Sequence, residues 1–82
     1  MTEISRFYGI IVYLFFNDYN PPHFKVKYGE YIAHIIIVNG TILNGDLPAD
    51  KLKLVSAWTE IHKKELMKMW KTKLFHKIEP LR

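Results

Sequence analysis

The chain has 82 residues, of which 12 are Lys or Arg and 8 are Asp or Glu, so its formal net charge is +4. It contains no Cys, which excludes disulfides, Cys-ligated zinc and thiol catalysis and is typical of a reducing compartment. The longest strongly apolar run, residues 9–16, is shorter than the roughly 20 residues of a membrane helix, and no signal-peptide pattern accompanies it. We therefore expect a single cytoplasmic domain, residues 1–82, that does not enter a membrane.

The charge is distributed unevenly along the chain. Residues 1–50 hold three basic and five acidic side chains, a net charge of −2. Residues 51–82 hold nine basic and three acidic side chains, a net charge of +6. This change of sign near residue 50 indicates a change of structural element and a basic second part.

Residues 9–45 predict an antiparallel sheet of about four strands, because β-branched and aromatic residues are dense there and turn signals recur at short intervals. The first strand is expected at residues 9–16, and it ends at a loop with two consecutive prolines. The second is expected at residues 23–28, where apolar and polar side chains alternate. The third and fourth are expected at residues 31–38 and 41–44.

Two turn signals connect the later strands. Gly29 and Glu30 fit a two-residue type II′ turn with Gly first. Asn39 with Gly40 is the pair preferred in type I′ turns. The strands should therefore follow one another as a meander.

Residues 48–74 predict one long amphipathic helix, with Pro48 at its first position and Asp50 in its first turn. At 100° per residue the charged side chains fall on one side, where Glu60 can pair with neighbouring lysines. The apolar sector opposite comprises Leu54, Val55, Trp58, Ile61, His62, Leu66 and Met69. A short tail, residues 75–82, follows, and the predicted fold class is α+β.

One face of the predicted sheet is left uncovered, because the strands at residues 9–16 and 31–38 are apolar on both faces and one helix covers a single face. We expect this face to bind a second copy of the chain or a small protein partner. The alternative is that a short N-terminal strand and the tail, through Ile78 and Leu81, close the gap within the monomer. The residues expected at the interface are Ile11, Tyr13, Phe15, Ile32, His34 and Ile36.

The loop before the second strand carries a candidate catalytic pair. His23 follows Asp18 at short range, and general acid–base catalysis uses an imidazole held beside a carboxylate, as in a small hydrolase. Arg6 could hold a phosphate or a carboxylate bidentately, or pair with Glu3 or Asp18. Because no nucleophile accompanies these residues, the alternative is a surface histidine that begins a strand, and an enzymatic activity is not the favoured reading.

Two further histidines suggest a metal site. His34 lies in an apolar strand and His62 lies on the apolar side of the helix, so they could face each other across the core. However, neither the HExxH spacing nor a cluster of Cys and His is present, and we expect no metal. A Walker loop, a GxSxG elbow and a Gly-rich dinucleotide turn are also absent, so the sequence predicts no cofactor.

The charged side of the helix carries lysines that could contact phosphates. A solvated helix face has the same pattern, and no helix-turn-helix, RNA-recognition or zinc-finger motif appears. Because of these lysines, a nucleic-acid-binding protein or an RNA-directed toxin is the alternative function. In a toxin, Arg6, Tyr8 and His23 would form the reactive centre. The candidate phosphate contacts are Lys63, Lys64, Lys68 and Lys71.

Several segments resemble a known family. EISRFYG at residues 3–9, NDYNPPHF at residues 17–24, the helix stretch at residues 58–66 with its Trp, His, Glu and Leu, and IEPL at residues 78–81 are similar to small bacterial proteins grouped as domain of unknown function 4160. The family label carries no assigned activity, and a shared fold would not supply one. The resemblance implies a protein encoded beside another short protein, as in a toxin–antitoxin module.

The chain departs from the family pattern in the proline loop. Family members commonly continue PPHF with a His where this chain has Lys25, and many have another His where it has Tyr19. Of a possible cluster of loop histidines, this chain keeps only His23. Zinc normally takes at least three protein ligands, so a zinc site in this loop should be impaired. Met69 likewise stands where an Asn often precedes the tryptophan of the helix. These departures count against metal or acid–base chemistry in the loop and against a polar function at the end of the helix.

Overall fold

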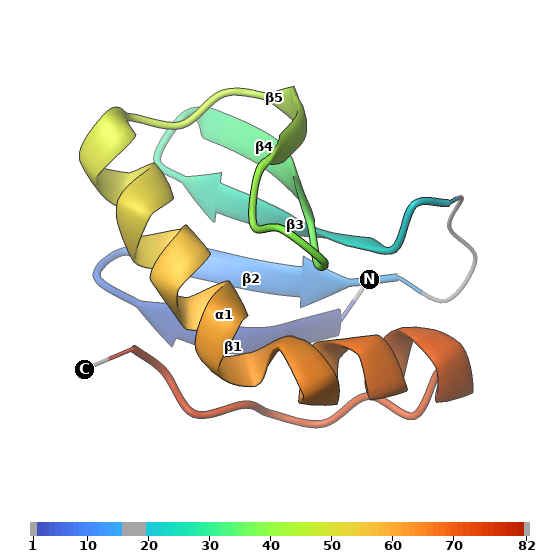
Figure 1. Ribbon diagram of the computed structural model, residues 1–82. Coiled ribbons are helices and arrows are strands. Elements are labelled where there is room, and N and C mark those ends of the chain that lie inside the picture. Colours follow the sequence, from blue (N-terminus) through green and yellow to red (C-terminus); the bar gives the residue numbers. More distant parts are fainter. Residues whose placement is uncertain (1, 16–19, 82) are drawn as a thin grey trace.

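The computed structural model describes residues 2–15 and 20–81, which form a five-stranded sheet and one helix in an α+β fold (Figure 1). The sheet order is β1-β2-β3-β4-β5, and every neighbouring pair is antiparallel. The predicted meander and the predicted C-terminal helix are confirmed. The elements are β1 (Thr2–Phe7), β2 (Ile10–Leu14), β3 (His23–Tyr28), β4 (Tyr31–Ile36), β5 (Ile42–Gly45) and α1 (Ala49–Thr72).

Strand β1 lies outside the predicted sheet, which starts at residue 9, and it raises the strand number from four to five. It pairs with β2 through a tight turn at Tyr8 and Gly9, so that Phe7 lies opposite Ile10. Both turn residues have positive φ, 48° and 79°, as in a type I′ turn. Asn-Gly is the usual signal for this turn and Tyr-Gly is not, which is why the hairpin escapes prediction.

Tyr8→Asn is expected to stabilise the protein by about 0.5–1 kcal/mol, because Asn adopts the left-handed conformation more readily than Tyr does. The Tyr8 side chain is 56% exposed, so its loss costs little packing. The corresponding rise in Tm, about 2–8 °C, can be measured by thermal circular dichroism. Tyr31→Asn is the matched control, because Tyr31 is also exposed but has an ordinary φ and should gain nothing. A lower Tm for Tyr8→Asn would contradict the prediction.

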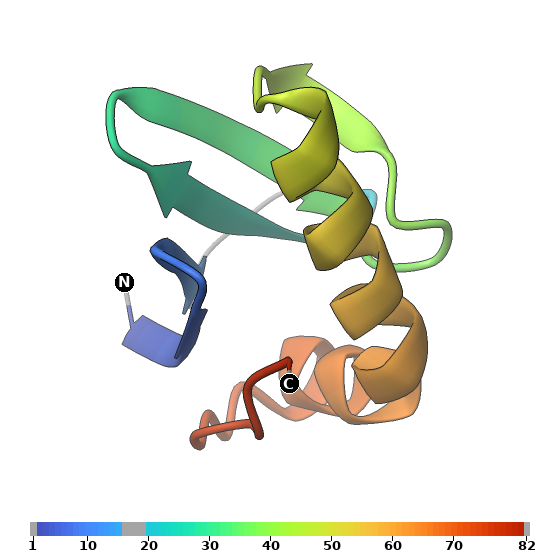
Figure 2. The ribbon, with the colours of Figure 1, turned by 90° about the vertical axis from the view of Figure 1, so that its left-hand side faces the viewer.

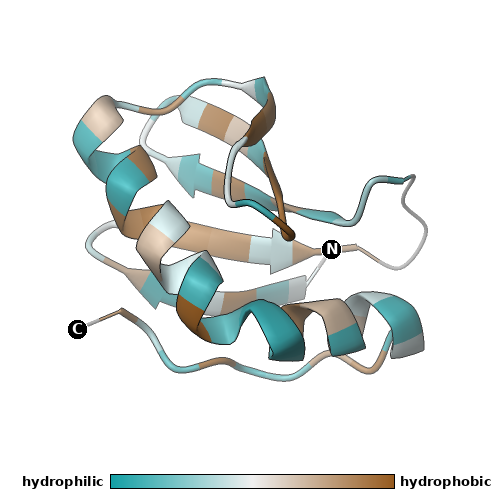
Figure 3. Cartoon of the chain, viewed as in Figure 1, coloured by the Kyte–Doolittle hydropathy of each residue, from teal (hydrophilic) through white to brown (hydrophobic). Residues whose placement is uncertain are grey.

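Helix α1 covers one face of the sheet, and the core lies between them (Figure 2). Alternate side chains of the three central strands point toward the helix and are completely buried: Ile10, Val12, Leu14, Phe24, Val26, Ala33 and Ile35. Trp58 is the largest buried side chain of α1, and its ring lies 5.5 Å from the ring of Phe7 and 5.7 Å from that of Phe24. Figure 3 shows the contrast between the hydrophobic tones of β2 and the mainly hydrophilic exposed side of α1.

Helix α1 is not straight, and one predicted member of its apolar side is exposed. The backbone is non-helical at His62, with φ −108°, and the helix ends before Lys73, whose φ is 60°. Ile61 is 66% exposed, so its place in the apolar sector is wrong. At 3.6 residues per turn it lies about 120° from the middle of the buried sector. That sector comprises Val55, Trp58, Thr59, Leu66, Met69 and Trp70.

The connection from β4 to β5 is wider than predicted. Asn39 does not have a positive φ, so the predicted type I′ turn at Asn39 and Gly40 is wrong, although Gly40 itself has φ +69°. The reason is Ile37, which is completely buried and whose amide donates a hydrogen bond to the carbonyl of Pro22 at 3.0 Å. Because Ile37 turns into the core, the loop needs more residues, and Gly40 donates to Ile36 at 2.8 Å.

The tail after α1 returns along the free edge of β1 (Figure 1). The amide of Ile78 donates to the carbonyl of Ile4 at 2.7 Å, and the indole of Trp58 donates to the carbonyl of Glu79 at 2.9 Å. Ile78 is buried, and Leu81 packs on the core while remaining partly exposed. Strand β1 therefore widens the sheet, and the tail attaches at its edge.

Candidate functional site

The face of the sheet that points away from α1, called the outer face below, is apolar on two strands and cationic on the strand between them. The register sets outward side chains of β2, β3 and β4 directly opposite one another. One row comprises Ile11, Lys27 and Ile32, and the next comprises Tyr13, Lys25 and His34.

Two more apolar side chains extend the outer face at one end. The ring of Phe15 stacks on that of His34, with centroids 6.4 Å apart and planes 5° apart. Ile36 follows His34 by two positions on β4 and therefore points the same way. The fold thus brings together on one face all six residues that the sequence analysis assigns to an interface. Ile32 is the most exposed of them, at 44%.

Charged side chains lie in the middle and at one edge of the outer face. The ammonium group of Lys25 lies 5.8 Å from the centre of the Tyr13 ring, and Lys27 is exposed. At the β1 edge, Arg6 forms a 2.9 Å ion pair with Glu3, one of the two partners predicted for it. The hydrogen bond from Arg6 lowers the pKa of the Glu3 carboxyl, so the small contribution of this exposed pair is lost when acid protonates Glu3.

His23 links the outer face to α1. It is completely buried, and its ring lies 5.5 Å from the ring of His34 and 5.3 Å from that of Trp70. Its Nδ1 lies 2.7 Å from the carbonyl oxygen of Pro21. His23 does begin a strand, but the expectation of a surface position is wrong because the second half of α1 covers it.

The candidate catalytic residues are not assembled into one centre by the described part of the chain. Asp18 lies outside the described residues. Arg6 lies in register with Ile11 and Lys27, four positions along β3 from His23, which is about 13 Å at 3.3 Å per residue. His23 and Arg6 therefore belong to different regions of the sheet.

The two histidines considered for a metal do not face each other. His34 lies beside His23, whereas His62 packs against Trp58 with ring centroids 5.3 Å apart. Nowhere in residues 2–15 and 20–81 do three His, Cys, Asp or Glu side chains gather as metal ligands.

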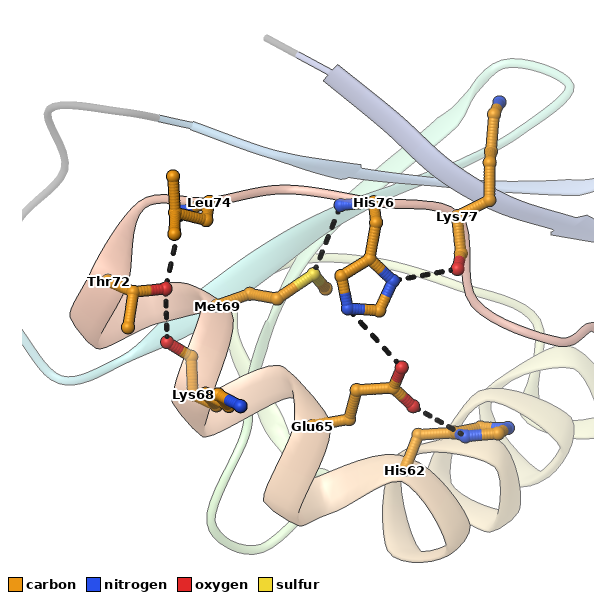
Figure 4. A network of polar contacts seen from close by, with 8 residues as sticks. All are labelled: His62, Glu65, Lys68, Met69, Thr72, Leu74, His76 and Lys77. Atoms are coloured by element: carbon orange, nitrogen blue, oxygen red, sulfur yellow. Dashed lines mark hydrogen bonds and ion pairs between the residues drawn. The ribbon is translucent and has the colours of Figure 1, made fainter.

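A separate polar network joins α1 to the tail (Figure 4). One carboxylate oxygen of Glu65 lies 3.7 Å from Nδ1 of His62, and the other lies 3.4 Å from Nε2 of His76. The amide of His76 also donates to the sulfur of Met69 at 3.4 Å. The His76 side chain is 54% exposed, and no local pattern in the sequence signals its contact with Glu65, because that contact depends on how the tail folds back.

The lysines of the second half of α1 surround a groove. It has a volume of about 640 Å³, and its floor is mainly apolar. The four lysines predicted as phosphate contacts all line it, and the complete lining is Lys63, Lys64, Met67, Lys68, Lys71 and Thr72. The molecule therefore has two separate candidate binding surfaces, this lysine groove and the outer face.

One family model matches most of the chain. The model of a family described as domain of unknown function 4160 matches residues 9–71, which include strands β2 to β5 and almost all of α1. No curated protein and no solved structure matches the chain. The described part of the chain holds no helix that is long and apolar enough to cross a membrane.

Proposed function

The chain belongs to the family of domain of unknown function 4160, and we propose that it is the protein-binding component of a two-protein module of the toxin–antitoxin kind in the bacterial cytoplasm. The observation that carries this proposal is the outer face, where apolar side chains of β2 and β4 flank the lysines of β3 while α1 packs on the other face of the sheet. A sheet that is apolar on both faces is stable when both are covered. The absence of Cys suits a reducing cytoplasm.

The charges on the outer face favour a different protein over a second copy of this chain. Lys25 and Lys27 lie on β3, the central strand of the sheet, between the apolar residues of its neighbours. Two stacked copies would bring the exposed Lys27 of both chains into one interface, and taking charges out of water costs several kcal/mol per ion. A partner that carries carboxylates opposite Lys27 and apolar side chains around them would satisfy both features.

Ile32→Glu is expected to weaken binding of the partner at least tenfold, which corresponds to about 1.4 kcal/mol. The substitution places a carboxylate in the apolar part of the outer face and neutralises Lys27 on the opposite strand. The probe is the short protein that the proposed module would encode beside this one, added to the purified chain. The measurement is the mass of the complex by light scattering and its Kd by calorimetry.

Val38→Glu is the matched control, because Val38 is also an exposed β-branched residue, at 51%, but follows the end of β4. It should leave binding unchanged. If Ile32→Glu binds the neighbouring protein as tightly as the native chain does, the outer face is not the interface. If the native chain forms a dimer by itself and the Ile32→Glu variant is a monomer, the outer face serves self-association and the proposed two-protein module is wrong.

A further inference from the structure

The lysine groove has a row of positive charges without matching carboxylates. Lys63 and Lys71 are eight positions apart on α1, about 12 Å at 1.5 Å per residue. In the described part of the chain, none of the ion pairs includes a lysine of this groove. The predicted pairing of Glu60 with the lysines that follow it is therefore absent, and the groove keeps its positive charge.

The groove is open, all of its lining residues belong to α1, and its apolar surface consists of Met67 and the methylene stems of the lysines. Met67 lies between the lysines and is partly buried against the core. The Arg, Asn and Gln side chains that usually read base edges are not part of the lining. A ligand that fits this chemistry has regularly spaced negative charges and an exposed apolar surface between them.

We propose that the lysine groove binds single-stranded nucleic acid, with the lysines on successive phosphates and Met67 against an unstacked base. A duplex offers the phosphates but keeps its bases inside, so the apolar floor would have no partner. A lysine ammonium binds phosphate as a point charge and carries no sequence information, so binding is independent of sequence. The groove lies on α1 and shares no residue with the outer face, so the two surfaces are distinct sites.

The test is the salt dependence of binding of a fluorescently labelled 12-nucleotide single strand of mixed sequence, followed by anisotropy. If each of the four lysines neutralises one phosphate, the slope of log K against log salt is about −2.8, and affinity falls about 50-fold between 50 and 200 mM salt. Lys68→Gln should make the slope shallower by about 0.7. Met67→Gln should weaken binding without changing the slope.

Lys53→Gln is the matched control, because it removes the same charge from an exposed position of the same helix outside the groove. It should leave the slope unchanged. Equal effects of Lys68→Gln and Lys53→Gln would mean that only net charge matters and would overturn the site. Equal affinity for a duplex of the same sequence would also overturn it, as would binding of polyglutamate in place of the oligonucleotide.

Discussion

Trp58→Ala is expected to leave the protein unfolded at 25 °C. Trp58 is completely buried, its ring lies between those of Phe7 and Phe24, and its indole donates a hydrogen bond to the tail at Glu79. Truncating a buried Trp costs about 3–5 kcal/mol, and the core of a domain this small supplies a comparable amount. Far-UV circular dichroism of the variant, with urea titration of the native chain as reference, measures the loss.

Trp58→Phe separates the packing of the ring from its hydrogen bond. The smaller aromatic ring preserves most of the contacts with Phe7 and Phe24 but leaves the carbonyl of Glu79 without the indole donor. We expect a cost of about 1–2 kcal/mol and a folded protein. Trp70 then remains as the single tryptophan and reports unfolding by fluorescence. A native spectrum and an unchanged urea midpoint for Trp58→Ala would show that the core does not depend on this residue.

Gly45→Ala is expected to destabilise the protein by about 2–5 kcal/mol, through backbone strain and overpacking together. Gly45 has φ +88° and pairs with Ala33 at the edge of the sheet. A Cβ built there would lie 2.7 Å from the Cα of Ala33 and would also press on the carbonyl oxygen of Ile32. That oxygen accepts a hydrogen bond from Asp46 at 3.1 Å, so faster hydrogen exchange at the Asp46 amide should accompany the lower urea midpoint.

Gly29→Ala isolates the part of this effect that comes from the backbone alone. Gly29 has φ +57°, and an added Cβ would meet nothing within 4 Å. Its expected cost is therefore only the left-handed penalty, about 1–2 kcal/mol. If both variants lost the same stability, the close approach of β5 to β4 would play no part.

The hairpin of β3 and β4 illustrates what local pattern can predict. Residues 23–28 alternate apolar and polar side chains, and in the structure the apolar ones face α1. Gly29 and Glu30 form the predicted two-residue connection, since Tyr28 lies opposite Tyr31. Strand period and turn chemistry agree here, so the register, and with it the composition of the outer face, follows from the sequence.

Features that depend on contacts between distant parts of the chain cannot be predicted from the local sequence pattern. The turn at Tyr8 uses a residue type that rarely adopts positive φ. Ile37 does not take part in the expected turn, because its side chain is buried in the core and its amide donates a hydrogen bond to the carbonyl of Pro22. The burial of His23 depends on the position of Trp70, which in turn depends on how α1 bends at His62. Periodicity describes one element at a time, whereas these positions are set by the packing of two or more elements.

The hydrogen bond between Ile78 and Ile4 has a consequence for synthesis on the ribosome. Each strand pairs with the next one in the chain, so the hairpins can form as they emerge. In contrast, the Ile4 carbonyl on the free edge of β1 has its hydrogen-bond partner 74 positions later in the chain (78 − 4). At ordinary rates of translation, Ile78 is synthesised about 4–15 s after Ile4. During that interval this edge can pair with other nascent chains, and the charged side chains of Glu3 and Arg6 on β1 act as gatekeepers against aggregation.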